Sequence, residues 1–144
     1  MQVITLPISV TTPGPGLHDI TARVQAAVNR SALREGLCTV FVRHTSASLL
    51  IQENADPSVR ADLQAWLARL VPEHDPLYTH NEEGPDDMPA HVKAALTQVS
   101  LQVPLQGGSL ALGRWQGVYL WEHRAGAHER SLLVTIIGTR APSG

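Results

Sequence analysis

Apolar and polar residues alternate in several short segments of the chain, and a period of two predicts strands. Segment 2–10 alternates in this way, and so does segment 37–43, where Cys38, Val40 and Val42 share one face. The same period recurs through the C-terminal third, in segments 101–105, 110–112, 115–124 and 131–138. Segment 48–54 is a further strand candidate, and Gly107-Gly108 predicts a tight hairpin between two of the later strands.

Three other segments place apolar residues three or four positions apart, which predicts helices. The first covers 17–31, with Asp19 as its N-cap. The second begins at Asp56-Pro57, an N-cap followed by proline at the first helical position. Its predicted buried stripe consists of Val59, Leu63, Trp66, Leu67 and Leu70. The third opens at Pro89, with inward positions predicted at Val92, Ala95, Leu96 and Val99.

The pattern therefore predicts about seven strands and three helices. Because the last strands follow one another without helices between them, the order favours an α+β fold, a β-sandwich of mostly antiparallel strands, over a doubly wound sheet. A length of 144 residues predicts one domain over 1–144.

Composition narrows the classes of partner. With 43% apolar and 17% charged residues, a net charge of −2 and a pI near 6.4, the chain has the balance of a globular protein and no basic footprint for nucleic acid. No window reaches the ~20 apolar residues of a membrane span. The N-terminus has no signal-peptide pattern, so we expect a cytoplasmic protein without membrane or nucleic-acid partners. The single cysteine, Cys38, excludes an internal disulfide.

Polar groups beyond those a core needs gather in a few places. Segment 73–87 holds six of the thirteen acidic residues, and a polar connection of this length is usually functional or disordered. Imidazole and carboxylate groups together are ligands for divalent transition metals. We therefore expect His44, at the end of a buried strand, to join His80 and His91 around a divalent ion, with Asp86 or Glu122 completing or orienting the site.

Structural roles are the alternative for each of these residues. His44 could hydrogen-bond to the backbone, and Asp56 has a sufficient role as N-cap. Glu122 could pair with Arg124, two residues along the same strand face. Asp86 and Asp87 could begin the third helix. Ser46 and Ser48 fit turn hydroxyls. The remaining histidines are expected at the surface: His18, His74, His123 and His128.

Four ordered blocks resemble the YjbQ-type family. They are His44-Thr-Ser-Ala-Ser, Glu53-Asn-Ala-Asp-Pro57, Gly84-Pro-Asp-Asp-Met-Pro-Ala-His91 with Lys93, and Leu112-Gly-Arg-Trp-Gln-Gly117 with Glu122. Arg114 and Gln52 depart from the commoner family pattern, which has threonine and asparagine there. The resemblance implies a small α+β fold with a β-sandwich, assembled as a homotrimer with pockets between subunits.

The resemblance also implies a weak, secondary thiamine-phosphate synthase activity, in which an aminopyrimidine pyrophosphate joins a thiazole phosphate and pyrophosphate leaves. On this basis we assign His44, His80 and His91 to a metal (zinc, manganese or magnesium). Catalytic roles go to Glu122, Asp86, Ser46 and Asn54, and cofactor binding to Glu53, Asp56 and Arg124. Two alternatives stay open: a metal-assisted hydrolase of a small phosphorylated compound, and a non-catalytic trimeric module that binds a metal or an anion.

Overall fold

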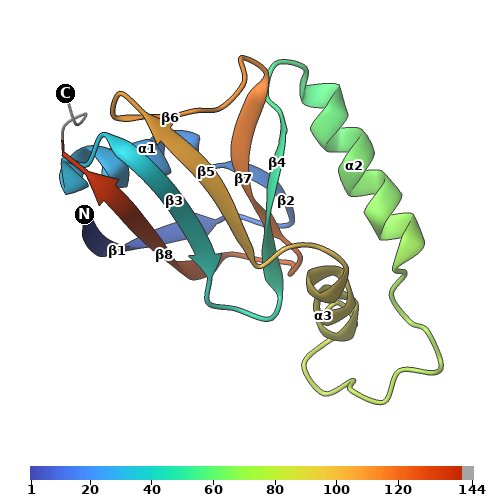
Figure 1. Ribbon diagram of the computed structural model, residues 1–144. Coiled ribbons are helices and arrows are strands. Elements are labelled where there is room, and N and C mark those ends of the chain that lie inside the picture. The colour runs from blue at the N-terminus through green and yellow to red at the C-terminus, as the bar shows by residue number, and fades with distance from the viewer. Residues whose placement is uncertain (141–144) are drawn as a thin grey trace.

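Two antiparallel sheets form the body of the protein in the computed structural model, which describes residues 1–140 (Figure 1). The larger sheet has five strands, in the order β1 (Gln2–Thr12), β8 (His128–Thr139), β3 (Glu35–Val42), β5 (Ser100–Gln106) and β6 (Ser109–Leu110). The smaller sheet has three, in the order β2 (Gly16–Asp19), β7 (Gln116–Glu122) and β4 (Ala47–Glu53). The predicted α+β fold of mostly antiparallel strands is confirmed.

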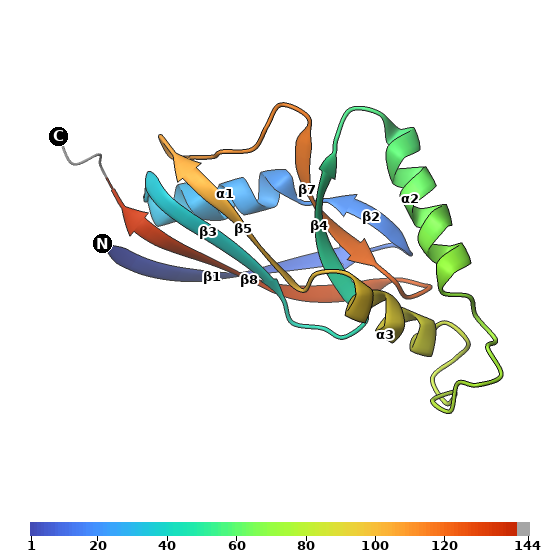
Figure 2. The ribbon, with the colours of Figure 1, turned by 45° about the vertical axis from the view of Figure 1, so that its right-hand side comes forward.

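Three helices complete the fold: α1 (Thr21–Ser31), α2 (Pro57–Leu70) and α3 (Asp87–Leu96). In both ribbon views α2 and α3 lie at the side of the molecule away from the N-terminus (Figure 2). No helix of residues 1–140 combines the length and the apolar character that crossing a membrane requires.

The main core lies between the two sheets and α1. It joins Val40 and Val134 of the larger sheet to Leu49 and Leu120 of the smaller one and to Val28 of α1. A second, smaller apolar cluster covers the other face of the smaller sheet, where Trp121 packs with Leu67 of α2 and Val92 of α3. The smaller sheet is therefore a middle layer, with α2 and α3 outside it.

The first predicted helix was placed too early in the chain. Residues 16–19 form β2 and pair with β7, with Leu17 opposite Trp121, so the helix begins only at Thr21. Asp19 does not occupy the N-cap position, which falls on Ile20, although its Oδ1 accepts hydrogen bonds from the backbone N–H and hydroxyl of Thr21. Tertiary pairing of the four residues outweighs their helical spacing.

The stripe predicted for the second helix was correct only in part, since Leu63 and Leu67 pack against the smaller sheet. Only Leu67 of α2 is buried, whereas Trp66 and Leu70 are 51% and 55% exposed. The helix does begin as predicted, with Asp56 Oδ1 accepting from the N–H of Ser58 and proline at the first position. In α3 the buried positions are likewise displaced, because Ala90 and Ala94 face inward while Leu96 is exposed.

The outer face of the larger sheet carries apolar residues without a covering helix. Val3, Phe41 and Ile137 are among the exposed large apolar side chains of the described chain. The outward positions of β8 include Leu133 and Thr135, which are uncharged. An antiparallel sheet face that meets water usually carries polar residues, so these exposed apolar side chains mark a candidate contact surface.

Candidate metal centre

Three side chains that can bind a metal converge at the start of α3. Asp87 is the first residue of the helix and His91 lies one turn later on the same face, while His80 comes from the preceding segment. One potential ligand atom from each lies within 4.8 Å of the other two. The Oδ2 atom of Asp87 is 2.7 Å from Nε2 of His80 and 3.3 Å from Nε2 of His91. Two imidazoles therefore face one carboxylate oxygen.

The tautomer of His91 is fixed by its other neighbour. Its Nδ1 lies 3.1 Å from the carbonyl oxygen of Thr45, and because a carbonyl can only accept, Nδ1–H is the donor. A neutral His91 then presents its Nε2 lone pair to the Asp87 carboxylate, which is electrostatically unfavourable. Either a proton on Nε2 or a cation between the two groups removes that repulsion. A backbone carbonyl behind the ring is a common partner of metal-binding histidines.

Arg124 holds the Asp87 carboxylate from the opposite side. Its Nη1 donates to Oδ1 of Asp87 at 2.8 Å, its Nε donates to Asp86 at 2.9 Å, and its Nη2 donates to the carbonyl of Glu83. Burial would raise the pKa of Asp87, but the hydrogen bond from His80 and the charges of His91 and Arg124 lower it by more. Asp87 is 2% exposed and is ionised at neutral pH, as a metal ligand must be.

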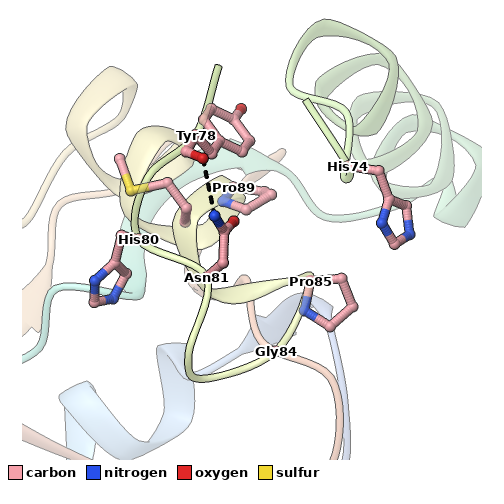
Figure 3. A pocket seen from close by; sticks show the side chains of 8 residues that line it. His74, Tyr78, His80, Asn81, Gly84, Pro85 and Pro89 are labelled. Atoms are coloured by element: carbon pink, nitrogen blue, oxygen red, sulfur yellow. Dashed lines mark hydrogen bonds between the residues drawn. The ribbon is translucent and has the colours of Figure 1, made fainter. Parts of the chain in front are cut away.

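A hollow of about 320 Å³ adjoins His80 (Figure 3). His74, Tyr78 and Asn81 line it from the segment between α2 and α3, and Pro89 lines it from α3 itself. Asn81 is held by a hydrogen bond from its Nδ2 to the carbonyl of Tyr78. None of the lining residues is lysine or arginine, so the hollow offers no fixed cation to an anionic ligand.

His44 lies beside this centre and is not one of the three converging residues. Its Nε2 accepts a hydrogen bond from the backbone N–H of Ser131 at 2.8 Å, which occupies the lone pair that a metal would need. His44 therefore hydrogen-bonds to the backbone, which is the structural role given above as the alternative to metal binding. His44 and His91 nevertheless line a common second hollow.

A second group of predicted site residues lies at the far end of β4. Asn54 donates from Nδ2 to the carbonyls of Arg114 and Gln116, and Oε2 of Glu53 accepts from the backbone N–H groups of Ala55 and Asp56. Asp56 caps α2, and the hydrogen bond from the N–H of Ser58 lowers its pKa. A seven-residue strand is about 20 Å long, so Glu53, Asn54 and Asp56 are remote from α3.

Glu122 is fully buried and has a different partner from the one considered above. Its carboxylate forms a close ion pair with Arg130 and accepts from the hydroxyl of Thr12, while Arg124 contributes only its backbone N–H. Burial acts to raise the pKa of Glu122, but the hydrogen bonds from Arg130 and Thr12 lower it to about 2. Ser46 supplies its backbone carbonyl to Arg130 and to the N–H of His123.

His123 was wrongly expected at the surface. It is 4% exposed, packs against Trp121, and its Nε2 lies 2.8 Å from the hydroxyl of Ser48. Burial, helped by the charge of Lys93, lowers its pKa to about 3, so the ring is neutral. The alternation along β7 continues to residue 123 and places its side chain under α2 and α3, a signal that the sequence already contained.

Asp87 is the member of the candidate centre that the sequence analysis did not select, since Asp86 was preferred. Asp86 instead accepts from Arg124 and from the N–H of Ala125, and the net effect lowers its pKa although burial acts to raise it. The spacing of Asp87 and His91, four residues apart on a helix, was the available signal. It favours Asp87 because residues i and i+4 share a helix face.

The fold and site define an α+β protein with two stacked antiparallel sheets and a candidate two-histidine, one-carboxylate centre. Residues 7–139 match the family described as UPF0047 protein YjbQ-like, and the chain belongs to this family. A UPF0047 protein from Synechocystis sp. is 54% identical over 129 residues, 90% of this chain and 88% of its own. UPF0047 protein YjbQ from Salmonella typhimurium is 39% identical over 132 residues, 91% and 95% of the two chains.

Solved structures agree with the sequence relatives. A conserved hypothetical protein from Thermus thermophilus superposes with a TM-score of 0.82 at 39% identity, covering 92% of this chain and 99% of that one. An uncharacterized YjbQ/UPF0047 protein from Clostridium acetobutylicum gives a TM-score of 0.84 at 37% identity, with the same coverage. Membership of this family supports the fold and does not identify a reaction.

Proposed function

We propose that His80, Asp87 and His91 hold one divalent metal ion and that the protein is a metal-dependent enzyme acting on a small molecule. The observation that carries this proposal is the convergence of two imidazole nitrogens on one oxygen of a buried carboxylate, within 4.8 Å. Two nitrogens and one oxygen are a set that zinc or manganese accepts more readily than magnesium, which prefers oxygen alone.

The chain's own groups prepare this centre for chemistry. Arg124 and the Thr45 carbonyl orient Asp87 and His91, so the ligands are held before any ion arrives. Three protein ligands leave coordination positions for a substrate or water, as in catalytic zinc sites. A bound divalent ion would supply Lewis-acid chemistry to a carbonyl or phosphoryl group. The adjoining hollow of about 320 Å³ admits only a small molecule.

Two reactions on small phosphorylated compounds are candidates. The resemblance to the family favours the secondary thiamine-phosphate synthase reaction, in which charge on the departing pyrophosphate must be neutralised. Three of the five N–H donors of the Arg124 guanidinium are engaged by Asp86, Asp87 and the Glu83 carbonyl, and the two carboxylates balance its charge. Neutralisation of the pyrophosphate would therefore fall mainly to the metal. The same metal would serve the hydrolysis of a phosphorylated compound equally well.

The experiment has a binding stage and a turnover stage. Isothermal titration of metal-free protein with Zn²⁺ and Mn²⁺ should give one ion per chain, and His80→Asn should weaken binding at least tenfold. His74→Asn is the matched control, because His74 lines the same hollow, lies outside the cluster, and adopts a positive φ that asparagine tolerates. If both variants bind the ion as tightly as the wild type, the proposed metal site is wrong.

Turnover assays then use the two thiamine precursors and a panel of phosphoesters. Release of thiamine phosphate or of inorganic phosphate that depends on the metal and on Asp87 supports the enzyme. Stoichiometric metal without turnover of any compound supports the non-catalytic binding module instead.

We also propose that the protein is a homotrimer that buries the outer face of the larger sheet. The exposed Val3, Phe41 and Ile137 on that face support an interface there, and the number three comes from the resemblance to the family. A cytoplasmic location is part of the same proposal.

A further inference from the structure

The second hollow beside α3 is distinct from the one next to His80. It has a volume of about 260 Å³ and is lined by His44, Thr45, His91, Ala94, Ala95 and Val99. Half of the lining residues are aliphatic: two alanines of α3 and the valine that follows the helix. His91 belongs both to this hollow and to the candidate metal centre, so the ring of one histidine borders both.

His44 contributes a hydrogen-bond donor with a fixed proton. A backbone N–H can only donate, so the bond from Ser131 requires a lone pair on Nε2 of His44. The neutral ring must then carry its proton on Nδ1. Within residues 1–140 that Nδ1–H has no hydrogen-bond acceptor. Protonating the ring would break the bond to Ser131, and burial together with the charge of Arg130 lowers the pKa of His44, so the ring stays neutral.

The geometry points to this hollow, which we name the α3 hollow, as the subsite for the apolar part of a small substrate whose oxygen binds the metal. The site would take a carbonyl or carboxyl compound with a short aliphatic chain, a substrate class other than the phosphorylated compounds that the family resemblance favours. His44 would donate its Nδ1–H to an oxygen of that compound, as a neutral donor and a positioning residue, without ligating the ion. This inference rests on the proposed metal site.

The test uses Co²⁺-loaded protein and a series of carboxylates: formate, acetate, propionate and butyrate. The visible absorption of Co²⁺ reports metal binding first and carboxylate binding second. Each methylene that enters an apolar hollow is worth about 0.8 kcal/mol, so affinity should rise about fourfold per carbon until the hollow is full. A flat series with Co²⁺ bound overturns the α3 hollow and leaves the metal site standing. Absence of Co²⁺ binding overturns both proposals.

Substitutions at two neighbouring exposed positions test the location. Ala95→Leu should fill the α3 hollow and abolish the gain with chain length. Leu96→Ala, at an exposed position that does not line the hollow, should preserve the gain, and both variants should bind Co²⁺ like the wild type. Both positions are exposed and lie in α3, where leucine and alanine are good helix formers, so neither change should unfold the protein. An unchanged series in Ala95→Leu, or a change in oligomeric mass in place of an altered series, would contradict the assignment.

The role of His44 is tested by His44→Phe. Loss of one hydrogen bond to a charged oxygen should weaken formate and butyrate alike by about tenfold, with Co²⁺ affinity unchanged. Loss of Co²⁺ from this variant, in protein that remains folded by circular dichroism, would make His44 a ligand and overturn its role as donor.

Discussion

Arg124 donates from Nη1 to Oδ1 of Asp87 at 2.8 Å, while Oδ2 of the same carboxylate faces His80 and His91. One buried carboxylate therefore connects the end of β7 to the candidate metal centre at the start of α3. The orientation of the ligand depends on a residue from another layer of the fold.

Replacing Arg124 by lysine keeps the charge but removes the planar fork that contacts Asp86 and Asp87 together. We expect affinity for Zn²⁺ to fall by about 10-fold or more, as for other residues that orient metal ligands. Because the charge is retained, the change reports orientation and not altered repulsion of the cation. Isothermal titration measures it, and Arg114→Lys, at the far end of β7, is the control. If Arg124→Lys binds Zn²⁺ as tightly as the wild type, Arg124 only holds the segment before α3 in place and does not orient a metal ligand.

Glu122→Gln should destabilise the protein by about 3–5 kcal/mol, because it leaves the buried Arg130 without its counter-charge. Denaturation by urea at pH 7 measures the change. The double variant Glu122→Leu with Arg130→Met should recover much of the loss, since a buried ion pair can often be replaced by apolar residues. The affinity of Glu122→Gln for the metal should equal that of the wild type. If the folded variant binds metal more weakly, Glu122 is part of the metal site, contrary to this prediction.

Acid should destabilise the protein in two overlapping ranges of pH. Burial lowers the pKa of His123 from 6.5 to about 3, so the unfolded chain binds more protons between these values and stability falls as the pH drops through them. The pKa of Glu122 is lowered from 4.5 to about 2, so its contribution is complete above pH 4.5 and is lost as the pH falls toward 2. Both effects have the same sign.

His123→Gln separates the two ranges. It should flatten the dependence of the unfolding free energy on pH between 6.5 and 4.5, where the wild type loses up to about 1.4 kcal/mol per pH unit. Urea denaturation at several pH values measures the slope, with His128→Gln, outside the core, as control. A slope identical to that of the wild type would mean that His123 is already protonated in the folded protein.

Phe41→Glu should break the proposed trimer, because it places a charge in the apolar outer face of the larger sheet. Light scattering during gel filtration should give the mass of one chain for this variant and of three for the wild type. Trp66→Glu, on the exposed side of α2, should keep the trimer. If Trp66→Glu dissociates the assembly and Phe41→Glu does not, the interface lies on α2.

The local signals in the chain were sufficient for most of the fold. Alternation identified β3 through the buried Cys38, Val40 and Val42, the Asp56-Pro57 pair identified the start of α2, and Gly107-Gly108 identified the hairpin. These features depend on residues close in sequence, such as a cap that bonds two positions away or glycines with positive φ. The short β2 was missed because its strand state comes from pairing with β7, a partner about a hundred residues away.

The sequence by itself determined the class of fold and the kinds of residue that could bind a metal, because periodicity and side-chain chemistry are local properties. Tertiary structure decided which of them meet. In the folded chain Asp87, and not Asp86, lies beside His80 and His91. The lone pair of His44 accepts from the N–H of Ser131, and the Glu122 side chain forms its ion pair with Arg130 and not with Arg124. Each of these choices depends on which strand end or helix face lies opposite, and no pattern within one segment specifies that.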